Sequence, residues 1–128
     1  MKTCSVRAWS LSVLVAFLAG CAGSPKNVSV MELATSPSKY DGNTVVIKGG
    51  VTQVSEEVTR RGNAYFCFQL TDGVYTVAVY STGKPTISNG DNVSVTGTFA
   101  REKRVTRYTF HDIVLMEIDA SKGSVKKV

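Results

Sequence analysis

The sequence is poor in the residues from which catalytic centres are built. Its 128 residues include one histidine, His111, and no nucleophile motif of the kind found in hydrolases. Ser–His–Asp chemistry needs a histidine held by a carboxylate in a specific geometry. The neighbouring Asp112 would face the opposite side of a strand from His111. We therefore predict that the protein is not an enzyme, and we interpret His111 as a residue at a bulge or on a rim.

No apolar run reaches the roughly 20 residues that a transmembrane helix needs. The run LSVLVAFL at residues 11–18 is short, follows the charges of Lys2 and Arg7, and precedes small residues. A charged start, a short apolar core and small residues are typical of a secretory signal peptide. We expect residues 1–20 to be such a signal.

The signal ends in LAGC at residues 18–21, which resembles the lipobox of bacterial lipoproteins. The resemblance implies that the chain is cut before Cys21, that a diacylglycerol is joined to the Cys21 thiol, and that the new amino terminus is acylated. Two acyl chains suffice for stable anchoring without a membrane span. An ordinary signal peptide followed by a chance cysteine is the alternative.

The residue after Cys21 bears on the destination of the protein. In enteric-type bacteria an aspartate at this position retains lipoproteins in the inner membrane, whereas this chain has Ala22. The resemblance therefore implies a lipid-anchored protein on the periplasmic face of the outer membrane, if the organism is Gram-negative. Residues 21–27 have the composition of a flexible linker and are expected to form the lipidated tether.

Loss of the signal changes both the charge and the cysteine count. The formal net charge falls from +5 to +3 because Lys2 and Arg7 are removed. So mild a positive charge does not by itself indicate nucleic acid. Cys4 is removed too, and lipidation of Cys21 would leave Cys67 alone, so we expect no disulfide, zinc site or cofactor. We interpret Cys67 as a semi-buried strand residue, because a reactive thiol needs exposure and nearby positive charge.

The rest of the chain favours strands. Residues 30–34 fit one short helical turn, with Asn27 or Ser29 as its cap, and Pro37 then ends it. Five runs have the content of strands. They cover residues 44–54, the two arms of a hairpin within residues 64–80, residues 92–99, and residues 107–118. Residues 121–128 are interpreted as a basic flexible tail.

Two local features modify these strands. Gly49-Gly50 stands in the middle of the first run and predicts a bend. A change of parity near His111 predicts a bulge in the last run. Five strands with a long, bent first strand favour a closed barrel, because closure removes exposed sheet edges.

This order resembles the OB-fold domains of bacterial envelope proteins. The resemblance is carried by VVIKGGV, YFCFQLTDG and GDNVSVTGTF, followed by a closing strand, and covers residues 28–120. It implies an all-β, five-stranded Greek-key barrel with a short N-terminal helical turn. The helix that usually follows the third strand is not expected in residues 81–91, which is a departure from the family.

The hairpin predicts two faces. Asp72-Gly73 favours a two-residue type I′ turn, which would place Tyr65 opposite Tyr80. One face would be the barrel interior and the other a mixed outer face. The interior face would carry Phe66, Phe68, Leu70, Tyr75, Val77 and Val79. The outer face would carry Tyr65, Cys67, Gln69, Thr76, Ala78 and Tyr80.

OB-folds bind ligands on the outer face of the second and third strands, between two loops. Both loops are basic here, and tyrosines between arginines are suited to stack on a base or sugar and hold a phosphate. The candidate ligand-binding residues are Tyr65, Tyr80, Arg60, Arg61, Arg101, Lys103, Arg104 and Arg107. Charged hairpin loops and cross-strand tyrosines also occur in sheets that bind nothing.

The leading hypothesis is a membrane-anchored interaction module for another envelope protein or an anionic envelope component. The alternative is a binder of single-stranded nucleic acid or oligosaccharide.

Overall fold

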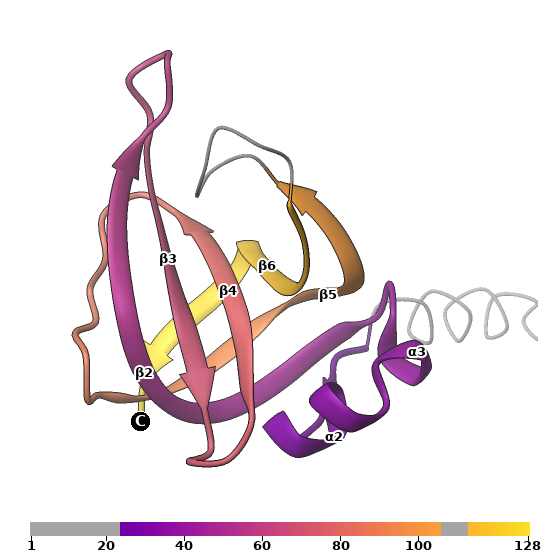
Figure 1. The fold of residues 1–128 in the computed structure, drawn as a ribbon. Coiled ribbons are helices and arrows are strands. Elements are labelled where there is room, and N and C mark those ends of the chain that lie inside the picture. Colours follow the sequence, from indigo (N-terminus) through magenta and orange to yellow (C-terminus); the bar gives the residue numbers. More distant parts are fainter. Residues whose placement is uncertain (1–23, 106–112) are drawn as a thin grey trace, which may run out of the picture.

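The computed structural model describes residues 24–105 and 113–128, which form a strand-rich domain with two short helices (Figure 1). The helices are α2 (Val30–Thr35) and α3 (Pro37–Tyr40). The strands are β1 (Lys26–Asn27), β2 (Thr44–Val58), β3 (Ala64–Thr71), β4 (Thr76–Thr82), β5 (Asn92–Val105) and β6 (Ile113–Lys127). The predicted signal peptide, residues 1–20, and Cys21 lie outside the described residues.

The strands close into a barrel. The sheet order is β1-β2-β3-β4-β6-β5, and a further pairing of β2 with β5 joins the two ends of the five long strands. The pairing of β4 with β6 is parallel, whereas the other pairings among these five strands are antiparallel. This is the OB-fold arrangement, and it confirms the fold class predicted from the sequence.

Strand β2 belongs to both halves of the barrel. Its residues 44–50 pair with β5, and its residues 50–58 pair with β3. The change of partner falls at Gly49-Gly50, as the glycine pair predicted. A Cβ on Gly49 would lie 2.8 Å from the Thr71 carbonyl oxygen, so this corner needs a residue without a side chain. A bulge follows, where Gln53 has a φ of 54° and the register shifts between Thr52 and Ser55.

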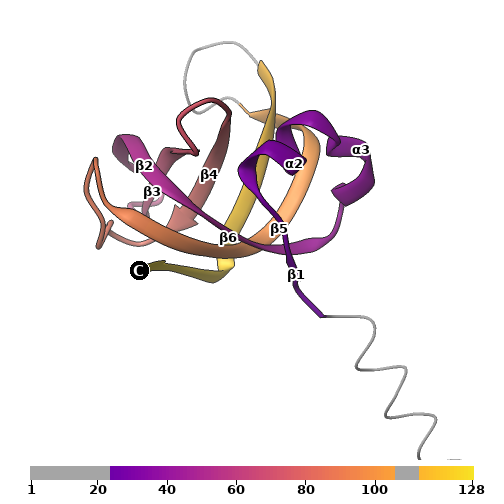
Figure 2. The same ribbon diagram turned by 90° about the horizontal axis from the view of Figure 1, so that it is seen from below.

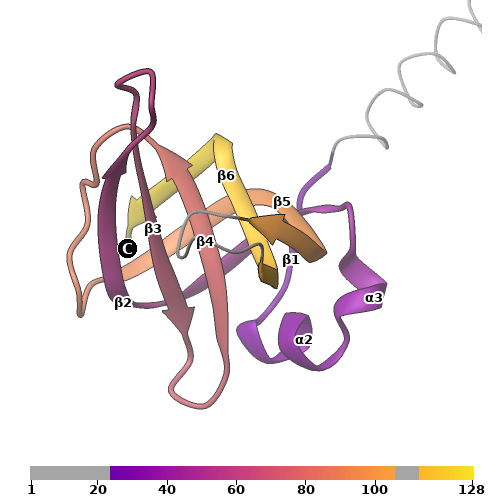
Figure 3. The same cartoon turned by 45° about the horizontal axis from the view of Figure 1, so that its top comes forward.

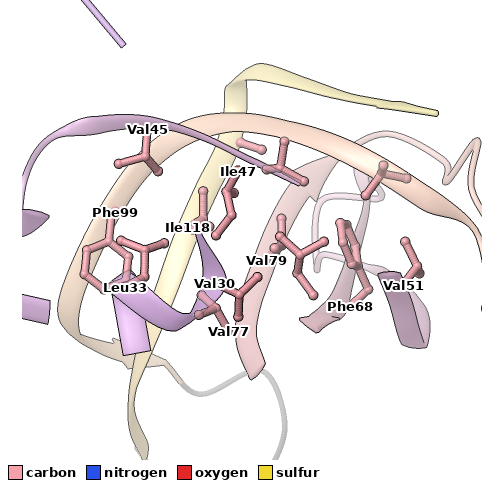
Figure 4. Packing of buried hydrophobic residues seen from close by; sticks show 14 of the residues in the cluster. Val30, Leu33, Val45, Ile47, Val51, Phe68, Val77, Val79, Phe99 and Ile118 are labelled. Carbon is pink, nitrogen blue, oxygen red and sulfur yellow. The ribbon is translucent and has the colours of Figure 1, made fainter. Parts of the chain in front are cut away.

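Helix α2 fills one end of the barrel. Ser29 caps it, since the Ser29 hydroxyl accepts from the Glu32 amide while the Glu32 carboxylate accepts from the Ser29 amide. Val30 and Leu33 are buried, and Figure 4 shows them among the same core residues as Val77 and Phe99. Residues 83–91 contain no helix, so a segment preceding the first barrel strand supplies the helix at the barrel end (Figure 3).

The turn of the β3–β4 hairpin differs from the prediction. Thr71 pairs with Thr76, so the loop has four residues, 72–75, instead of two. The Asp72 carboxylate accepts from the amides of Val74 and Tyr75, which closes a wider, side-chain-stabilised turn. The register is thereby moved by two residues, and Tyr80 lies opposite Cys67 instead of Tyr65.

The two predicted faces survive this shift, because a displacement of two residues preserves side-chain parity. The inward residues of the hairpin that are fully buried are Phe66, Phe68, Leu70, Val77 and Val79. Tyr75 lies in the loop and packs, partly buried, against this core.

Several boundaries differ from the sequence-based expectations. Strand β2 continues to Val58, past the expected end at residue 54, and β4 ends at Thr82. Strand β5 continues to Val105, well past residue 99. Residues 121–127, expected to be a flexible tail, belong to β6 and pair with β5 from Ser124 to Lys127. Lys26 and Asn27, expected within the tether, pair with Val45 and Val46 of β2. The bulge predicted near His111 lies outside the described residues.

The position of α2 at the barrel end predicts that two of its residues, Met31 and Leu33, contribute differently to the free energy of unfolding. Leu33 is fully buried, whereas half of the Met31 surface is exposed. We expect Leu33→Ala to lower the free energy of unfolding by about 2–5 kcal/mol, and Met31→Ala to change it by no more than about 0.5 kcal/mol. Urea unfolding measures both. Equal effects of the two substitutions would show that α2 does not close the core.

The turn predicts a dependence on pH. Hydrogen bonds from the amides of Tyr75 and Val74 lower the pKa of the Asp72 carboxyl. The stabilisation is therefore present above the unfolded pKa of about 3.9 and is lost as the pH falls through the lower folded value. We expect Asp72→Ala to lower Tm at pH 7 and to change it much less at pH 2. Asp72→Asn, which keeps an acceptor oxygen, is the control. A Tm difference between Asp72→Ala and the parent that is equal at both pH values would contradict this.

Candidate binding face

The outer face of β3 and β4 carries the tyrosine pair. The Tyr65 and Tyr80 ring centroids are 5.6 Å apart, with the rings tilted by 43°. Because Cys67 opposes Tyr80 and Thr82 opposes Tyr65, the rings meet diagonally across the hairpin. Both tyrosines are half-buried. The structure therefore brings together the two aromatic residues of the predicted site, by a different register from the one expected.

The centre of this face is small and closely packed. Cys67 is 3% exposed and Ala78 is 6% exposed, although both point away from the barrel interior. Burial of this degree removes the exposure that a reactive thiol requires. The position of Cys67 supports its interpretation as a packed strand residue.

Carboxylates surround the tyrosines, which the sequence-based account of the site missed. Glu57 lies opposite Tyr65, and Asp119 lies opposite Tyr80. Glu117 lies opposite Ala78 and is 1% exposed. Laterally paired residues share a face of a sheet, so this surface combines aromatic groups with carboxyl groups.

The candidate arginines within the described residues lie on two elements, the β2–β3 turn and strand β5. Arg60 and Arg61 are exposed in the tight turn of residues 59–63 that joins β2 to β3. Arg101 is directed toward α3, where its guanidinium donates to the Ser38 hydroxyl, 3.2 Å away. It also lies 3.4 Å from the carboxylate of Glu102.

Lys103 and Arg104 lie on β5, not in a loop, because the strand continues to Val105. The ammonium of Lys103 is 4.0 Å from the Asp119 carboxylate, so it offsets part of the negative charge beside Tyr80. Arg104 is exposed and pairs with Val114 of β6. Arg107 lies outside the described residues. The loop prediction was wrong here because alternating charged residues are compatible with an exposed strand edge as well as with a loop.

A cavity of about 340 Å³ lies where β4 and β6 separate. Its lining is mostly hydroxyl-bearing residues and lysines, among them Ser81, Thr82, Lys84, Ser124 and Lys126, together with Phe66. It exists because β6 pairs with β4 only at residues 117–119 and then follows β5. Gly97 and Gly123 permit that crossing, since a Cβ on either would overlap the other strand's backbone. These two glycines were the feature of the sequence from which the close approach of β5 and β6 could have been predicted.

No group of three or more potential metal-ligating side chains occurs in the described residues. No helix in that part of the chain is long and apolar enough to cross a membrane.

Solved structures with a similar fold have low sequence identity to this chain. The similarity to yeast Stn1 and Ten1 has a TM-score of 0.58 and 10% identity, over 84% of this chain and 64% of that one. The similarity to an aspartyl-tRNA synthetase from Leishmania major Friedlin has a TM-score of 0.56 and 18% identity, over 82% of this chain and 21% of that one. The similarity to RecG bound to a three-way DNA junction has a TM-score of 0.53 and 18% identity, over 83% of this chain and 13% of that one.

The chain thus spans less than two thirds of each of these proteins. At such identities the likeness shows the fold alone. No protein-family model matches the sequence, and no curated protein matches it.

Proposed function

We propose that the mature chain is a lipid-anchored, non-enzymatic OB-fold module that binds another protein of the cell envelope through the outer face of β3 and β4. The observation that carries this proposal is the composition of that face. It joins a tyrosine pair to a small, packed centre and to carboxylates on both flanks. Tyrosine is enriched at protein interfaces, where it provides rigid apolar area together with a polar group.

The charge on this face supports a protein partner over a polyanion. Glu57 is exposed and lies opposite Tyr65, and Asp119 lies opposite Tyr80 with the Lys103 ammonium 4.0 Å from its carboxylate. A basic side chain of a partner protein would gain electrostatic energy beside the exposed Glu57 carboxylate, whereas a phosphate would lose it there.

A nucleic-acid ligand is the second candidate, and exposed Arg60 and Arg61 at the β2–β3 turn favour it. The RecG structure, which has a similar fold region, is bound to a DNA junction. Such binding would fall steeply with rising salt, because phosphate contacts release counterions.

The partner face is tested by Tyr80→Ser in the tagged full-length protein, purified from solubilised membranes. We expect the amount of co-purifying partner to fall about tenfold or more, as is usual when an interface tyrosine is truncated. Val74→Ser, in the exposed β3–β4 turn, is the matched control and should leave recovery unchanged.

Equal recovery with both variants would contradict the proposal. Salt-sensitive binding of a single-stranded oligonucleotide that disappears in Arg60→Ala/Arg61→Ala would favour the second candidate instead.

The anchor is tested by Cys21→Ser and cell fractionation. The LAGC motif predicts that Cys21 carries the acyl chains, so we expect the substituted protein to leave the membrane fraction and become soluble in the envelope. Ser24→Ala, three residues along, is the control. Membrane association that survives Cys21→Ser would refute the anchor.

A further inference from the structure

We infer that the outer face of β2, β5 and β6 lies against the bilayer and contacts the phosphates of anionic phospholipids. This inference rests on the lipid anchor of the proposed function and adds an orientation to it. The face consists of three short lateral rows. One row, Thr44, Thr98 and Asp119, contains a carboxylate that already accepts hydrogen bonds from Ser121 and lies 4.0 Å from the Lys103 ammonium. The outward residues of the other two rows carry the argument. They are Lys48, Ser94 and Lys126 in one row, and Val46, Thr96 and Ser124 in the next.

The first step is the length of the tether. If Cys21 is acylated, only residues 22–25 separate it from β1. Five residue steps from Cys21 to Lys26 span at most about 18 Å when fully extended. Strand β1 is not free to swing outward, because Lys26 and Asn27 pair with Val45 and Val46. The part of the domain beside β1 must therefore stay close to the bilayer surface.

The second step is what lies beside β1. Asn27 opposes Val46, and Lys48 is two residues further along the same face of β2, a distance of about 7 Å. Figure 2 shows β1 at the point where the chain enters the domain, and β1 pairs there with the first part of β2. A shallow groove of about 470 Å³ lies there, lined by Asn27, Val28, Ser29, Val46 and Lys48. The surface that the tether holds nearest the bilayer is thus the outer face of the first part of β2, which continues across its lateral pairs into β5 and β6.

The third step is the chemistry of this face. Lys48 and Lys126 flank Ser94 in a single row, so their Cα atoms are about 10 Å apart. Both lysines are exposed, and hydroxyl groups of Ser94, Thr96 and Ser124 lie between and beside them. The six outward residues of the two rows include no carboxylate. Ammonium and hydroxyl groups are donors for phosphate oxygens, and each basic residue near an anionic membrane contributes about 1 kcal/mol.

The carboxylate of Glu32 is near the groove but is already engaged. It accepts hydrogen bonds from the Ser29 amide and from the Tyr40 hydroxyl, and Tyr40 is buried. These bonds hold it against the domain.

The two sides of the barrel would then contact different surroundings, one the bilayer and the other the aqueous compartment. In Figure 1 strands β3 and β4 are nearer the viewer than β5 and β6. A domain resting on β2, β5 and β6 would present the tyrosine face and the β2–β3 turn to the aqueous compartment.

The test uses the acylated full mature protein in vesicles, with its lipidation checked by mass. Cys67→Ala removes the internal thiol, and a fluorophore is placed on Ser94→Cys or, as the distal position, on Arg61→Cys. The vesicles contain phospholipids with spin-labelled headgroups and either phosphatidylcholine alone or an added phosphatidylglycerol fraction. We expect quenching at position 94 to exceed that at position 61 several-fold in phosphatidylglycerol vesicles, and to fall in phosphatidylcholine alone.

Two charge-reversal variants complete the design on the Ser94→Cys background. Lys48→Glu/Lys126→Glu should reduce quenching at position 94 to the level of position 61, whereas Arg60→Glu/Arg61→Glu should leave it unchanged. Equal quenching at positions 94 and 61, with the protein still floating with the vesicles, would overturn this inference alone. Equal quenching at position 94 in both lipid mixtures would overturn the recognition of anionic lipid. Protein that fails to acylate and float would overturn the anchor, and this inference with it.

Discussion

The fold depends on one strand that serves two sheets. The first half of β2 pairs with β5 and its second half pairs with β3, so the barrel closes only if β2 turns sharply at Gly49-Gly50. At this bend in β2, the Thr71 backbone lies so close to Gly49 that any side chain on Gly49 would overlap it. Strands β3 and β4 are then brought to the side opposite β5, and the core forms between them (Figure 4).

The same constraint separates the two outer surfaces. One is the β3–β4 face, with aromatic and acidic residues. The other is the face of β2, β5 and β6, with two lysines and several hydroxyl groups. Because β1 pairs with the start of β2, the chain enters the domain beside the basic surface. An acylated amino terminus would thus hold the basic side near lipid and leave the acidic, aromatic side for a partner.

The sequence was sufficient for the barrel and its core. Alternation along the hairpin assigned the buried phenylalanines correctly even though the turn was wrong, because the error of two residues preserved parity. The four-residue turn depends on hydrogen bonds that the Asp72 side chain accepts. The preference of Asp-Gly for a two-residue turn does not take these bonds into account.

The candidate site was less predictable, because it depends on which strands become neighbours. Glu57 and Asp119 are distant in sequence from Tyr80, and only pairing of β2, β3, β4 and β6 places them on one face. Similarly, Arg101 was expected to join a ligand loop, but the extension of β5 directs it toward Ser38.

The central claim is that the two faces of the barrel meet different surroundings in the cell. Site-specific photo-crosslinking tests it most directly, with benzoylphenylalanine in place of Gln69 on the outer face of β3 or Ser94 on the outer face of β5. The account predicts a discrete protein adduct from position 69 and none from position 94. Protein adducts from position 94 alone, or none from position 69, would contradict it.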